Sequence, residues 1–520
     1  MSDHRNVLLI IVDQWRGDTL SKLGHPCLRT PHLDALCADA VTFRRHYTQC
    51  APCGPARASL LTGQYMMNHR VVQNGTPLDA RHDNLAWEAR KAGYDPALVG
   101  YTTTTPDPRT TAPDDPRYRF RGHSMPGWTP IAPLDPARRP YFNWLRQRGF
   151  AVPTPPEDIW LPADGFEPTG GATRASSRIP QDLSDTSWTT EHGLAYMKGV
   201  EGQSWLLHLG YFRPHPPFIA PSPYHEAYDP EEAPAPVRAD SPEAEAAQHP
   251  LLEHYMRTIK QSKFFRDGEG LGSEMSEAEV RVMRAAYYGL MSEIDDNLGR
   301  IIAYLKESGQ YDNTLIIFTS DHGEQLGNHH LLGKVGYFDD AFHIPLIVRD
   351  PSPEADASRG QVVERFTESI DIMPTILSWI GTKIPRQCDG ASLLPLCRGT
   401  TPKDWRTEVH YEFDFRPYYD DAGEPPPFGL SLDQCGLAVV QDEKRKYVHF
   451  DALPPLFFDL SEDPDQFVNR AADSGCAPVV LDYAQKMLSW RMRYSERNLT
   501  AYAATPNGLL DRAPDAASLI

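Results

Sequence analysis

The sequence has no hydrophobic run long enough to cross a membrane. Its clearest apolar run, Val7–Val12, has six residues, whereas a transmembrane helix needs about 20 and the core of a signal peptide about 7–15. We therefore expect no membrane segment and no signal peptide, and we predict a cytoplasmic location.

The chain is also short of positive charge. It has 51 Lys and Arg residues against 70 Asp and Glu residues, which gives a net charge of -19. Such a surface repels nucleic acids and anionic membranes, so neither is an expected partner. If the protein binds a small anion, it must gather basic residues locally, and the basic residues inside motifs are therefore the informative ones.

Cysteine is sparse, with eight residues in 520 and none of the dense spacing of a disulfide-rich secreted domain. Cys50 and Cys53 form a Cys-x-x-Cys pair, which by itself is compatible with a redox pair, half of a zinc site or inert buried residues. A structural zinc usually needs a second close pair of ligands. The other cysteines offer none, since they lie at positions 27, 37, 388, 397, 435 and 476.

Short apolar runs bounded by turn residues predict strands, and helical patterns lie between them. Strands are expected at Val7–Val12, Ala97–Gly100, Trp205–Leu209, Thr314–Thr319 and Ile344–Val348. Helices are expected at Thr30–Ala40, Leu85–Ala92, Ser276–Ser308 and Ile370–Ile380. Thr30 is predicted to cap the first of these helices, and Ser276 and Glu279 to form a capping box. The alternation predicts an α/β fold in which a large sheet is sandwiched by helices.

Two long stretches lack this periodicity, Thr102–Ser187 and Pro214–Pro250, and such stretches are usually functional loops or oligomer contacts. After Gly381 the pattern changes to short strands and one helix: Val409–Phe413, Leu437–Gln441, Lys446–Phe450, Leu456–Leu460 and the helix Val479–Arg493. We therefore predict a main α/β domain over residues 1–380. A smaller α+β domain follows over residues 381–520 and ends in a tail from residue 504.

Two of the predicted strands end in potential metal ligands. Asp13-Gln14 follows the first strand and Asp321-His322 follows the strand Thr314–Thr319. Because ligands of open α/β sheets bind at the carboxyl ends of strands, we expect these four side chains to share one metal. Their oxygens suit a hard divalent cation such as Ca²⁺, and the histidine nitrogen moves the preference toward Mn²⁺. A lone Asp after a strand is more often a helix cap, but the pairing of two strand ends favours the metal.

Cys53 is predicted at the N-terminus of a helix. Pro55 suits the first turn and Gly63 can end the helix, so free amides would favour an anion beside the Cys53 side chain. Arg57, one turn on, can reach back toward it, although an arginine there is about as often part of a surface ion pair.

Five further residues are candidates for contact with a negatively charged group. His215 lies between prolines that restrict its backbone, and Lys334 lies between glycines that allow close approach. Asn74 belongs to an Asn74-Gly75 pair that can form a turn, and Tyr101 and Thr103 follow a predicted strand end. An ordinary loop histidine, a solvated lysine and three structural polar residues are the alternatives for these positions.

Taken together, these motifs resemble the sulfatase branch of the alkaline phosphatase superfamily over nearly the whole chain. Four motifs occur in order: Cys53-x-Pro55-x-Arg57, Asp321-His322-Gly-Glu324, Gly-Lys334 and Leu456-Phe-Phe-Asp-Leu-Ser-Glu-Asp-Pro464. The chain is most similar to bacterial phosphonate monoester hydrolases and related arylsulfatases. That likeness rests on Asp13-Gln14-Trp-Arg16, Asn74, Gly100-Tyr-Thr-Thr103 and Tyr211-Phe-Arg-Pro-His215-Pro-Pro.

The resemblance implies an alkaline-phosphatase-like fold and a metal-dependent ester hydrolase. Cys53 would be converted to formylglycine by a formylglycine-generating enzyme, and its hydrate would attack sulfate monoesters, phosphonate monoesters or phosphodiesters to give a covalent intermediate. One divalent metal, Mn²⁺ or Ca²⁺, would be held by Asp13, Gln14, Asp321 and His322. The other implied catalytic residues are Arg57, Asn74, Tyr101 and Thr103, which would orient the substrate, and His215 and Lys334, which would stabilise or protonate the leaving oxygen. A homodimer or homotetramer is implied as well.

The chain departs from the usual sulfatase pattern at four positions. Gln14 stands where many sulfatases have Asp, His322 where many have Asn, and Tyr101 and Thr103 where typical members have Lys and His. Fewer fixed charges imply a permissive site. Two alternatives stay open: a metal-dependent phosphodiesterase or phosphomutase-like enzyme with an unmodified nucleophile, and a non-catalytic anion-binding protein on the same fold.

Overall fold

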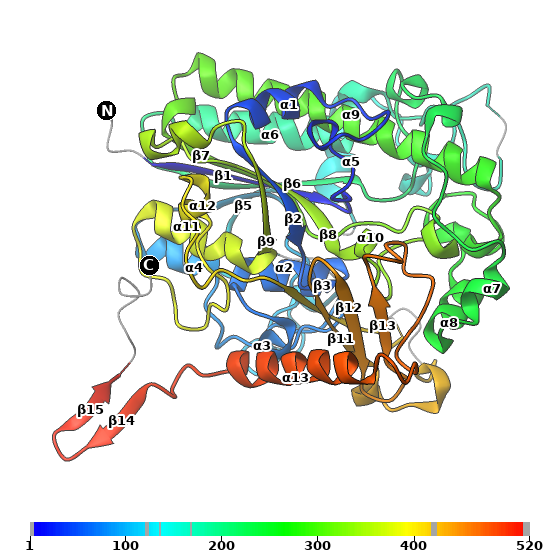
Figure 1. Cartoon of the computed structure of the whole chain (residues 1–520). Helices are drawn as coiled ribbons and strands as arrows, with labels where there is room; N and C mark the ends of the chain where they lie inside the picture. Colours follow the sequence, from blue (N-terminus) through cyan, green and yellow to red (C-terminus); the bar gives the residue numbers. More distant parts are fainter. Residues whose placement is uncertain (1–4, 120–123, 135–136, 167–168, 418–423, 513–520) are drawn as a thin grey trace.

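The apolar runs of the sequence assemble into one eight-stranded mixed sheet, shown by the computed structural model in Figure 1. The structure describes residues 5–119, 124–134, 137–166, 169–417 and 424–512. Within these ranges, no helix combines the length and apolar character needed to cross a bilayer.

The strand order of this sheet is β5-β4-β6-β1-β7-β8-β2-β9. The strands are β1 (Asn6–Asp13), β2 (Val41–Tyr47), β4 (Ala97–Gly100), β5 (Thr129–Pro133), β6 (Leu206–Pro214), β7 (Thr314–Ser320), β8 (His343–Arg349) and β9 (Val362–Glu368). All five predicted strands are present, and the run from β5 to β7 is parallel. β2, β5 and β9 were not predicted, because β2 and β9 carry charged residues and β5 is an edge strand with two prolines.

Helices cover both faces of the sheet, which confirms the predicted α/β sandwich (Figure 1). On one face lie α1 (Pro31–Ala38), α6 (Asp185–Gly199) and α9 (Glu277–Glu307). On the other lie α2 (Cys53–Thr62), α4 (Leu85–Lys91) and α11 (Ile372–Ile380). Successive side chains along β1 point to opposite faces of the sheet, so β1 contributes to the core on both sides. Its even-numbered apolar residues join the core beneath α9, and its odd-numbered ones join the core that includes α11.

The helix starts were predicted with mixed success. Ser276 and Glu279 form the predicted capping box at α9, since the Ser276 Oγ accepts from the Glu279 amide at 3.3 Å and the Ser276 amide donates to Glu279 at 2.7 Å. The prediction for Thr30 is wrong, although α1 does begin at Pro31. The Thr30 hydroxyl bonds to the Ser21 hydroxyl, and Asp295 of α9 accepts instead from the amides of residues 32 and 33 at 3.0 and 2.7 Å. A carboxylate brought in by packing is a stronger acceptor than a hydroxyl.

The two stretches without periodicity contain short regular elements. Thr102–Ser187 includes β5, α5 (Arg139–Gln147) and the start of α6, and Pro214–Pro250 includes α7 (Pro242–Ala246) and ends where α8 (Pro250–Thr258) begins. Of these, α7 has only five residues and is too short to show a repeating apolar pattern. α5 does carry such a pattern in Tyr141, Phe142, Trp144 and Leu145, so that helix could have been predicted.

A second sheet of five strands packs beside the first, in the order β13-β12-β11-β10-β3. Its strands are β3 (Cys50–Ala51), β10 (Val409–Asp414), β11 (Gly436–Gln441), β12 (Arg445–Phe450) and β13 (Leu456–Asp459), and α13 (Ala477–Tyr494) packs on β11 and β12. The four later strands were predicted. Because β3 comes from the first part of the chain and pairs with β10 directly before Cys53, the small sheet is not built from residues 381–520 alone. The domain division itself stays a prediction.

Part of the predicted tail is ordered. The strands β14 (Tyr502–Thr505) and β15 (Gly508–Asp511) form a two-stranded hairpin that projects away from the body of the molecule (Figure 1). Residues 513–520 lie outside the described part of the chain. The Asn507-Gly508 pair between two short apolar runs is a hairpin signal that the sequence offered.

We expect Gly100 to be essential to the sheet edge that carries the site. Gly100 ends β4 with a φ of +112°, and a Cβ there would lie 2.5 Å from the Gly210 carbonyl oxygen of β6. The change Gly100→Ala should lower the free energy of unfolding by about 3 kcal/mol, because it adds backbone strain to a steric overlap. Urea denaturation followed by circular dichroism measures the loss.

Gly149→Ala is the matched control. Gly149 also has a positive φ, +79°, but no atom of the described residues would lie within 4 Å of its Cβ. We expect a loss of only about 1 kcal/mol there. If Gly100→Ala and Gly149→Ala lost the same free energy of unfolding, the close contact between β4 and β6 would not be the reason that residue 100 is glycine.

Candidate functional site

The site is built where the adjacent strands β1 and β7 end. Asp13 is the last residue of β1, and Asp321 follows directly after β7. The Ser320 hydroxyl donates to the Val12 carbonyl at 2.8 Å, and the backbone amide of Gln14 donates to Asp321 Oδ1 at 3.2 Å. A bulge between Val12 and Asp13 and a φ of +73° at Gln14 turn the chain at this point. The two strand ends are thereby tied together, as predicted from their positions in the sheet.

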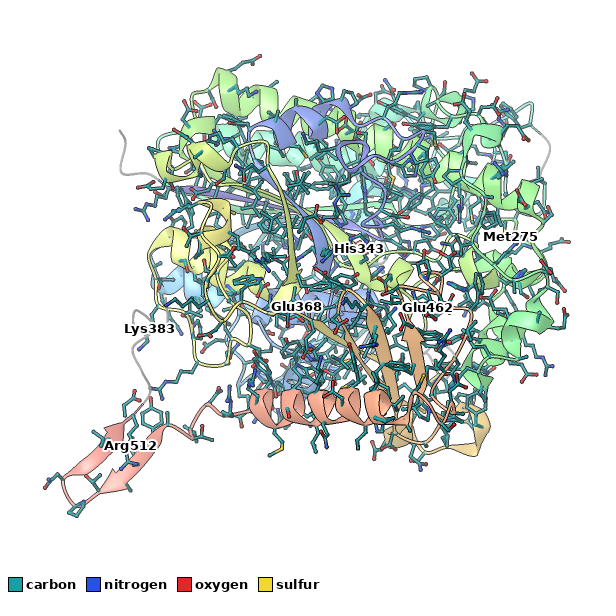
Figure 2. All side chains as sticks on the ribbon, in the orientation of Figure 1. Met275, His343, Glu368, Lys383, Glu462 and Arg512 are labelled. Carbon is teal, nitrogen blue, oxygen red and sulfur yellow. The ribbon has the colours of Figure 1, made fainter. Side chains whose placement is uncertain are left out.

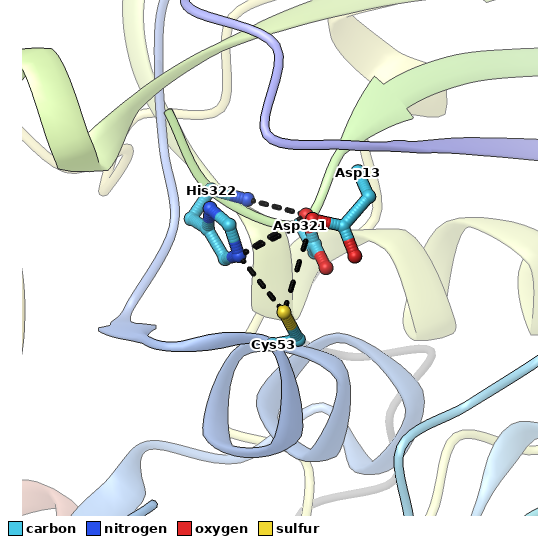
Figure 3. A group of neighbouring side chains, drawn as sticks. All are labelled: Asp13, Cys53, Asp321 and His322. Carbon is cyan, nitrogen blue, oxygen red and sulfur yellow. Dashed lines mark hydrogen bonds and ion pairs between the residues drawn. The ribbon is translucent and has the colours of Figure 1, made fainter. Parts of the chain in front are cut away.

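Four ligand-type side chains meet at this point (Figure 3). Asp13, Cys53, Asp321 and His322 each present one ligand atom, and these four atoms lie within 4.8 Å of one another in a buried cluster. The Cys53 Sγ lies 3.2 Å from His322 Nε2 and 3.8 Å from Asp13 Oδ1. Cys53 is the first residue of α2, and Gly63 ends that helix with a left-handed φ, so both predicted helix bounds are confirmed.

A hydrogen bond and a low pKa together define the protonation of His322. Its Nδ1 lies 3.0 Å from the Gly323 carbonyl oxygen, which can only accept, so Nδ1 carries a proton. Burial and the positive charge of Lys334 hold the pKa of His322 well below its ordinary value. A neutral imidazole whose Nε2 faces two carboxylates has the arrangement of a metal ligand.

Arg57 lies behind the cluster and is fully buried. Its Nε lies 2.9 Å from Asp321 Oδ2, and a terminal nitrogen lies 3.4 Å from Asp13 Oδ2. The guanidinium also donates to the Tyr101 carbonyl at 3.1 Å and stacks over the Tyr101 ring at 4.3 Å. Arg57 is therefore not part of a surface ion pair; it joins α2 to the ends of two strands.

The charges of the cluster are unevenly balanced. Burial and the neighbouring Asp13 raise the pKa of Asp321 to about 7, in spite of Arg57. Burial acts in the same direction on Asp13, but Lys334 and other positive groups outweigh it and hold the pKa of Asp13 below its ordinary value. An added divalent cation would allow both carboxylates to be ionised together. The donor set of two carboxylates and one imidazole nitrogen therefore fits such a cation.

Gln14 is held in a defined orientation. Its Nε2 donates to the buried Glu324 carboxylate, and its Oε1 accepts from the Lys334 ammonium at 2.7 Å. Lys334 also lies 3.2 Å from the Cys53 Sγ and 3.8 Å from Asp13 Oδ1. Glu324 was not predicted as a site residue, although its place in the Asp-His-Gly-Glu motif was a signal for it. It fixes which end of the Gln14 amide faces the cluster.

Asn74, Tyr101 and Thr103 line the same region. Asn74 Oδ1 accepts from the Gly54 amide at 2.7 Å, and the Tyr101 hydroxyl donates to Asp13 Oδ2. Thr103 has a left-handed φ of +54°. A Cβ at Gly54 would lie 3.0 Å from Asn74 Oδ1 and 3.4 Å from the Thr103 carbonyl oxygen, so these residues pack closely around the start of α2.

His215 follows the end of β6. Its Nδ1 lies 2.8 Å from the Pro216 carbonyl oxygen, and its ring packs on Phe212 with centroids 4.5 Å apart. Burial, Lys334 and His322 hold the pKa of His215 well below its ordinary value, while Asp13 opposes them. All eleven predicted site residues therefore lie around the ends of β1, β4, β6 and β7 or the start of α2. Their individual roles stay predictions.

Comparison with known proteins gives matches over almost the whole chain. The sulfatase family matches residues 5–382, and the family described as N-sulphoglucosamine sulphohydrolase, C-terminal, matches residues 327–493. The multifunctional alkaline phosphatase superfamily protein PehA of Trinickia caryophylli is 55% identical over 98% of this chain and 99% of its own. An arylsulfatase of Clostridium perfringens is 26% identical over 95% of this chain and 96% of its own. Among solved structures, the phosphonate monoester hydrolase of Agrobacterium radiobacter superimposes with a TM-score of 0.93 at 43% identity, covering 98% of this chain and 100% of that one.

The fold and these matches define an ester hydrolase of the alkaline phosphatase superfamily. The chain belongs to the sulfatase family. The resemblance inferred from the motifs is thereby confirmed.

Loss of Arg57 should destabilise the fold strongly. In Arg57→Met two buried carboxylates lose their counter-charge, and we expect the free energy of unfolding to fall by about 3–5 kcal/mol. The thermal midpoint should recover in part when Mn²⁺ is added, because a bound cation would compensate the same carboxylates. Differential scanning calorimetry with and without Mn²⁺ measures both effects.

Arg257→Met is the matched control for charge removal. Arg257 pairs with Glu253 at 2.7 Å on an exposed helix surface, where such a pair contributes about 0–1 kcal/mol. The loss of stability in Arg57→Met should exceed that in Arg257→Met. An equal loss in the two variants, or no effect of Mn²⁺ on Arg57→Met, would contradict the role given to Arg57 in the buried cluster.

Proposed function

We propose that this protein hydrolyses sulfate monoesters and phosphonate monoesters, and phosphodiesters as well, with a formylglycine formed from Cys53. One observation carries the proposal: the Cys53 side chain lies at the N-terminus of α2, among the ligand-type groups at the ends of β1 and β7. The relatives support the substrate classes, since one is named a multifunctional superfamily protein, one an arylsulfatase and one a phosphonate monoester hydrolase.

The protonation state of the Cys53 thiol favours its modification to formylglycine over nucleophilic attack by the thiol itself. Burial and the charge of Asp13 raise the pKa of the Cys53 thiol to about 12, so the unmodified side chain is protonated at neutral pH and is a weak nucleophile. In the modified protein, the Sγ position corresponds to an oxygen of the hydrated aldehyde. Formylglycine supplies an oxygen nucleophile there, and a formylglycine-generating enzyme would be needed to produce it.

A divalent metal fits beside this nucleophile. Asp13, Gln14, Asp321 and His322 would hold Mn²⁺ or Ca²⁺, with Gln14 presenting its Oε1 because Glu324 fixes its amide. A bound metal supplies Lewis acidity and favours the ionised form of an attacking hydroxyl. The Arg57 guanidinium and the Tyr101 hydroxyl orient the two carboxylates from behind.

Lys334 and His215 are both partly exposed, and we place them on the side of the nucleophile that the substrate occupies. The Lys334 ammonium lies 3.2 Å from the nucleophile position, so it can neutralise a charged ester and donate a proton to the leaving oxygen. Burial and Lys334 hold the pKa of His215 well below its ordinary value, so the ring is neutral. Its Nδ1 donates to the Pro216 carbonyl, which leaves a lone pair at Nε2. It is therefore placed to accept a hydrogen bond or a proton, and we assign proton donation to Lys334.

The site tolerates different anions because fewer of its groups carry a fixed charge than in the usual sulfatase pattern. Gln14, Tyr101 and Thr103 orient by hydrogen bonds and packing rather than by formal charge. A tetrahedral sulfur or phosphorus group with one negative charge is neutralised by Lys334 without a second fixed cation in front of the nucleophile. We therefore expect measurable turnover of both aryl sulfates and aryl phosphonate monoesters.

Cys53→Ala tests the nucleophile. We expect kcat/KM on 4-nitrophenyl sulfate and on 4-nitrophenyl phenylphosphonate to fall together by at least about 10⁴-fold, because both substrates need the same nucleophile. Mass spectrometry of the peptide that contains residue 53 of the wild-type protein should show the aldehyde in place of the thiol.

Cys50→Ser is the control within the same Cys-x-x-Cys pair. The Cys50 thiol lies 3.3 Å from the Ser59 hydroxyl and is not one of the four ligand atoms of the cluster, so this variant should keep its turnover. An intact thiol at residue 53 in fully active protein would favour the phosphodiesterase alternative. Near-normal turnover of Cys53→Ala would overturn the proposal.

Lys334→Met tests charge neutralisation at the substrate. We expect kcat to fall by about 10²–10³-fold on both substrates, as for the loss of one stabilising charge in a buried site. The exposed Lys198→Met serves as the control and should retain full turnover. Steady-state kinetics with aryl esters of different leaving-group pKa values provides the second readout. If Lys334 protonates the leaving oxygen, the loss should grow as the leaving group becomes more basic.

A further inference from the structure

A cavity of about 430 Å³ lies beside α9. Its lining comes from the turn after β1, from residues 23–26, from β2 and from α9. His343, labelled in Figure 2, is the first residue of β8 and forms another part of the wall. None of the eleven predicted site residues is among the described residues that line it. Its volume is in the range of cavities that bind small molecules.

The ionised groups of this lining are mostly positive. The guanidiniums of Arg16, Arg44 and Arg284 line the cavity, together with the carboxylate of Asp18. Both oxygens of Asp18 accept hydrogen bonds from Arg16, at 2.9 and 2.5 Å, so that this carboxylate is already paired. In a chain with a net charge of -19, a cavity of this kind is a local positive region that attracts anions.

Arg284 is a buried cation without a carboxylate partner in the described part of the chain. It is 4% exposed. Its guanidinium donates to the Leu326 carbonyl at 3.0 and 2.9 Å, to the Pro234 carbonyl at 2.9 Å and to Asn328 Oδ1 at 2.6 Å. Burial and the positive charge of Arg16 lower the pKa of Arg284. Since buried charges in proteins are normally paired, an anion in the cavity would provide the counter-charge.

Tyr288 presents an open hydrogen-bond donor to the same space. It lies one turn along α9 from Arg284 and lines the cavity, although the whole residue is only 2% exposed. Its hydroxyl forms no hydrogen bond with any residue that the structure describes. Burial raises the pKa of Tyr288, so the hydroxyl keeps its proton and can donate it to an anion.

His25 presents a second donor. Its Nδ1 accepts from the backbone amides of Cys27 and Leu28 at 3.4 and 3.0 Å. Burial lowers the pKa of His25 to about 4, although Asp18 opposes this shift, so the ring is neutral. A neutral ring whose Nδ1 accepts must carry its proton on Nε2. The ring meets the Tyr288 ring edge to face with centroids 4.9 Å apart, which brings the two donors into one part of the cavity.

Arg44 provides donors at the rim. Its Nε donates to Glu364 at 2.9 Å, and one terminal nitrogen lies 3.5 Å from the Leu23 carbonyl oxygen. The other terminal nitrogen has no partner among the described residues. Because the side chain is 42% exposed, it can turn toward an anion that enters the cavity.

We propose that this cavity binds a tetrahedral oxyanion, inorganic phosphate or sulfate, through hydrogen bonds from Tyr288, His25 and Arg44. Arg16 and Arg284 act as fixed counter-charges. Arg16 donates to the Gln325 carbonyl at 3.3 Å, and Arg284 to Leu326 as above. Both guanidiniums are therefore held in place before the anion arrives, which reduces the entropy lost on binding.

The proposed oxyanion site is connected to the reactive centre only through the protein. Gln325 and Leu326 belong to the loop between Glu324 and Lys334, so the two fixed guanidiniums join the cavity to the loop that carries Lys334. The binding of an oxyanion here does not depend on the proposed hydrolysis, because no residue of the cavity takes part in that reaction. The test therefore measures binding and needs no turnover.

Tyr288→Phe combined with Arg44→Met tests the site. The double variant removes two donors, keeps the packing of the buried ring and leaves the buried Arg16 and Arg284 in place. Isothermal titration calorimetry of the full-length protein is performed with inorganic phosphate and, separately, with sulfate. We expect the wild-type chain to show a binding event whose dissociation constant rises at least about 100-fold in the double variant, since hydrogen bonds to a charged ligand are strong.

Tyr196→Phe combined with Arg45→Met is the matched control. Arg45 is the next residue along β2 and pairs with Glu443, and neither Tyr196 nor Arg45 lines the cavity. This protein should bind both anions as the wild type does, and circular dichroism should show that both double variants stay folded. Absence of binding to the wild-type chain, or equal affinity in the wild type and in Tyr288→Phe with Arg44→Met, would overturn the proposal.

X-ray diffraction with selenate locates the anion directly. Selenate has the shape and charge of sulfate, and the anomalous scattering of selenium identifies its position. We expect an anomalous peak within hydrogen-bond distance of the Tyr288 hydroxyl in crystals of the wild-type protein, and none there in crystals of the Tyr288→Phe and Arg44→Met double variant. Wild-type crystals with no selenate in the cavity, or with selenate only beside Cys53, would show that this cavity is not an oxyanion site.

Discussion

The buried contact between Arg57 and two aspartates is the interaction on which the rest of this structure depends. Arg57 comes from the first turns of α2, while Asp13 and Asp321 end two strands that are about 300 residues apart in sequence and adjacent in the sheet. Two buried carboxylates would repel each other without a counter-charge. One guanidinium therefore fixes where the helix that carries Cys53 meets the sheet, and so places Cys53 opposite the two carboxylates.

The same contact sets the electrostatics of the site. Arg57 satisfies the carboxylates from behind and leaves their other oxygens facing Cys53 and His322. Burial keeps His322 neutral and the Cys53 thiol protonated, and Lys334 is the cation that faces the nucleophile directly. The site thus holds two cations in different places: Arg57 lies behind the carboxylates, and Lys334 lies beside Cys53.

Much of the fold and the site was predictable, because the signals were local. Buried parallel strands read as apolar runs, and ligand residues directly after them identify the edge at which they meet. Three features were not local. The start of α1 is capped by Asp295 from a distant helix instead of Thr30. Gln14 is oriented by Glu324. The strand β3 joins a sheet formed by residues near 410. In each case the two partners are far apart in the sequence and meet only through tertiary packing. Local sequence patterns do not show such pairs.

By itself, the sequence determined the chemical groups of this protein: a cysteine in a sulfatase-type motif, carboxylates at strand ends, and the helix and strand periods that form an α/β sandwich. Only the tertiary structure decided how these groups act together. It assigned Arg57 to the carboxylates and fixed the protonated nitrogens of His322 and His215. The reason is physical: residue type sets what a side chain can do, while burial and the nearest charges decide its protonation state and its partner.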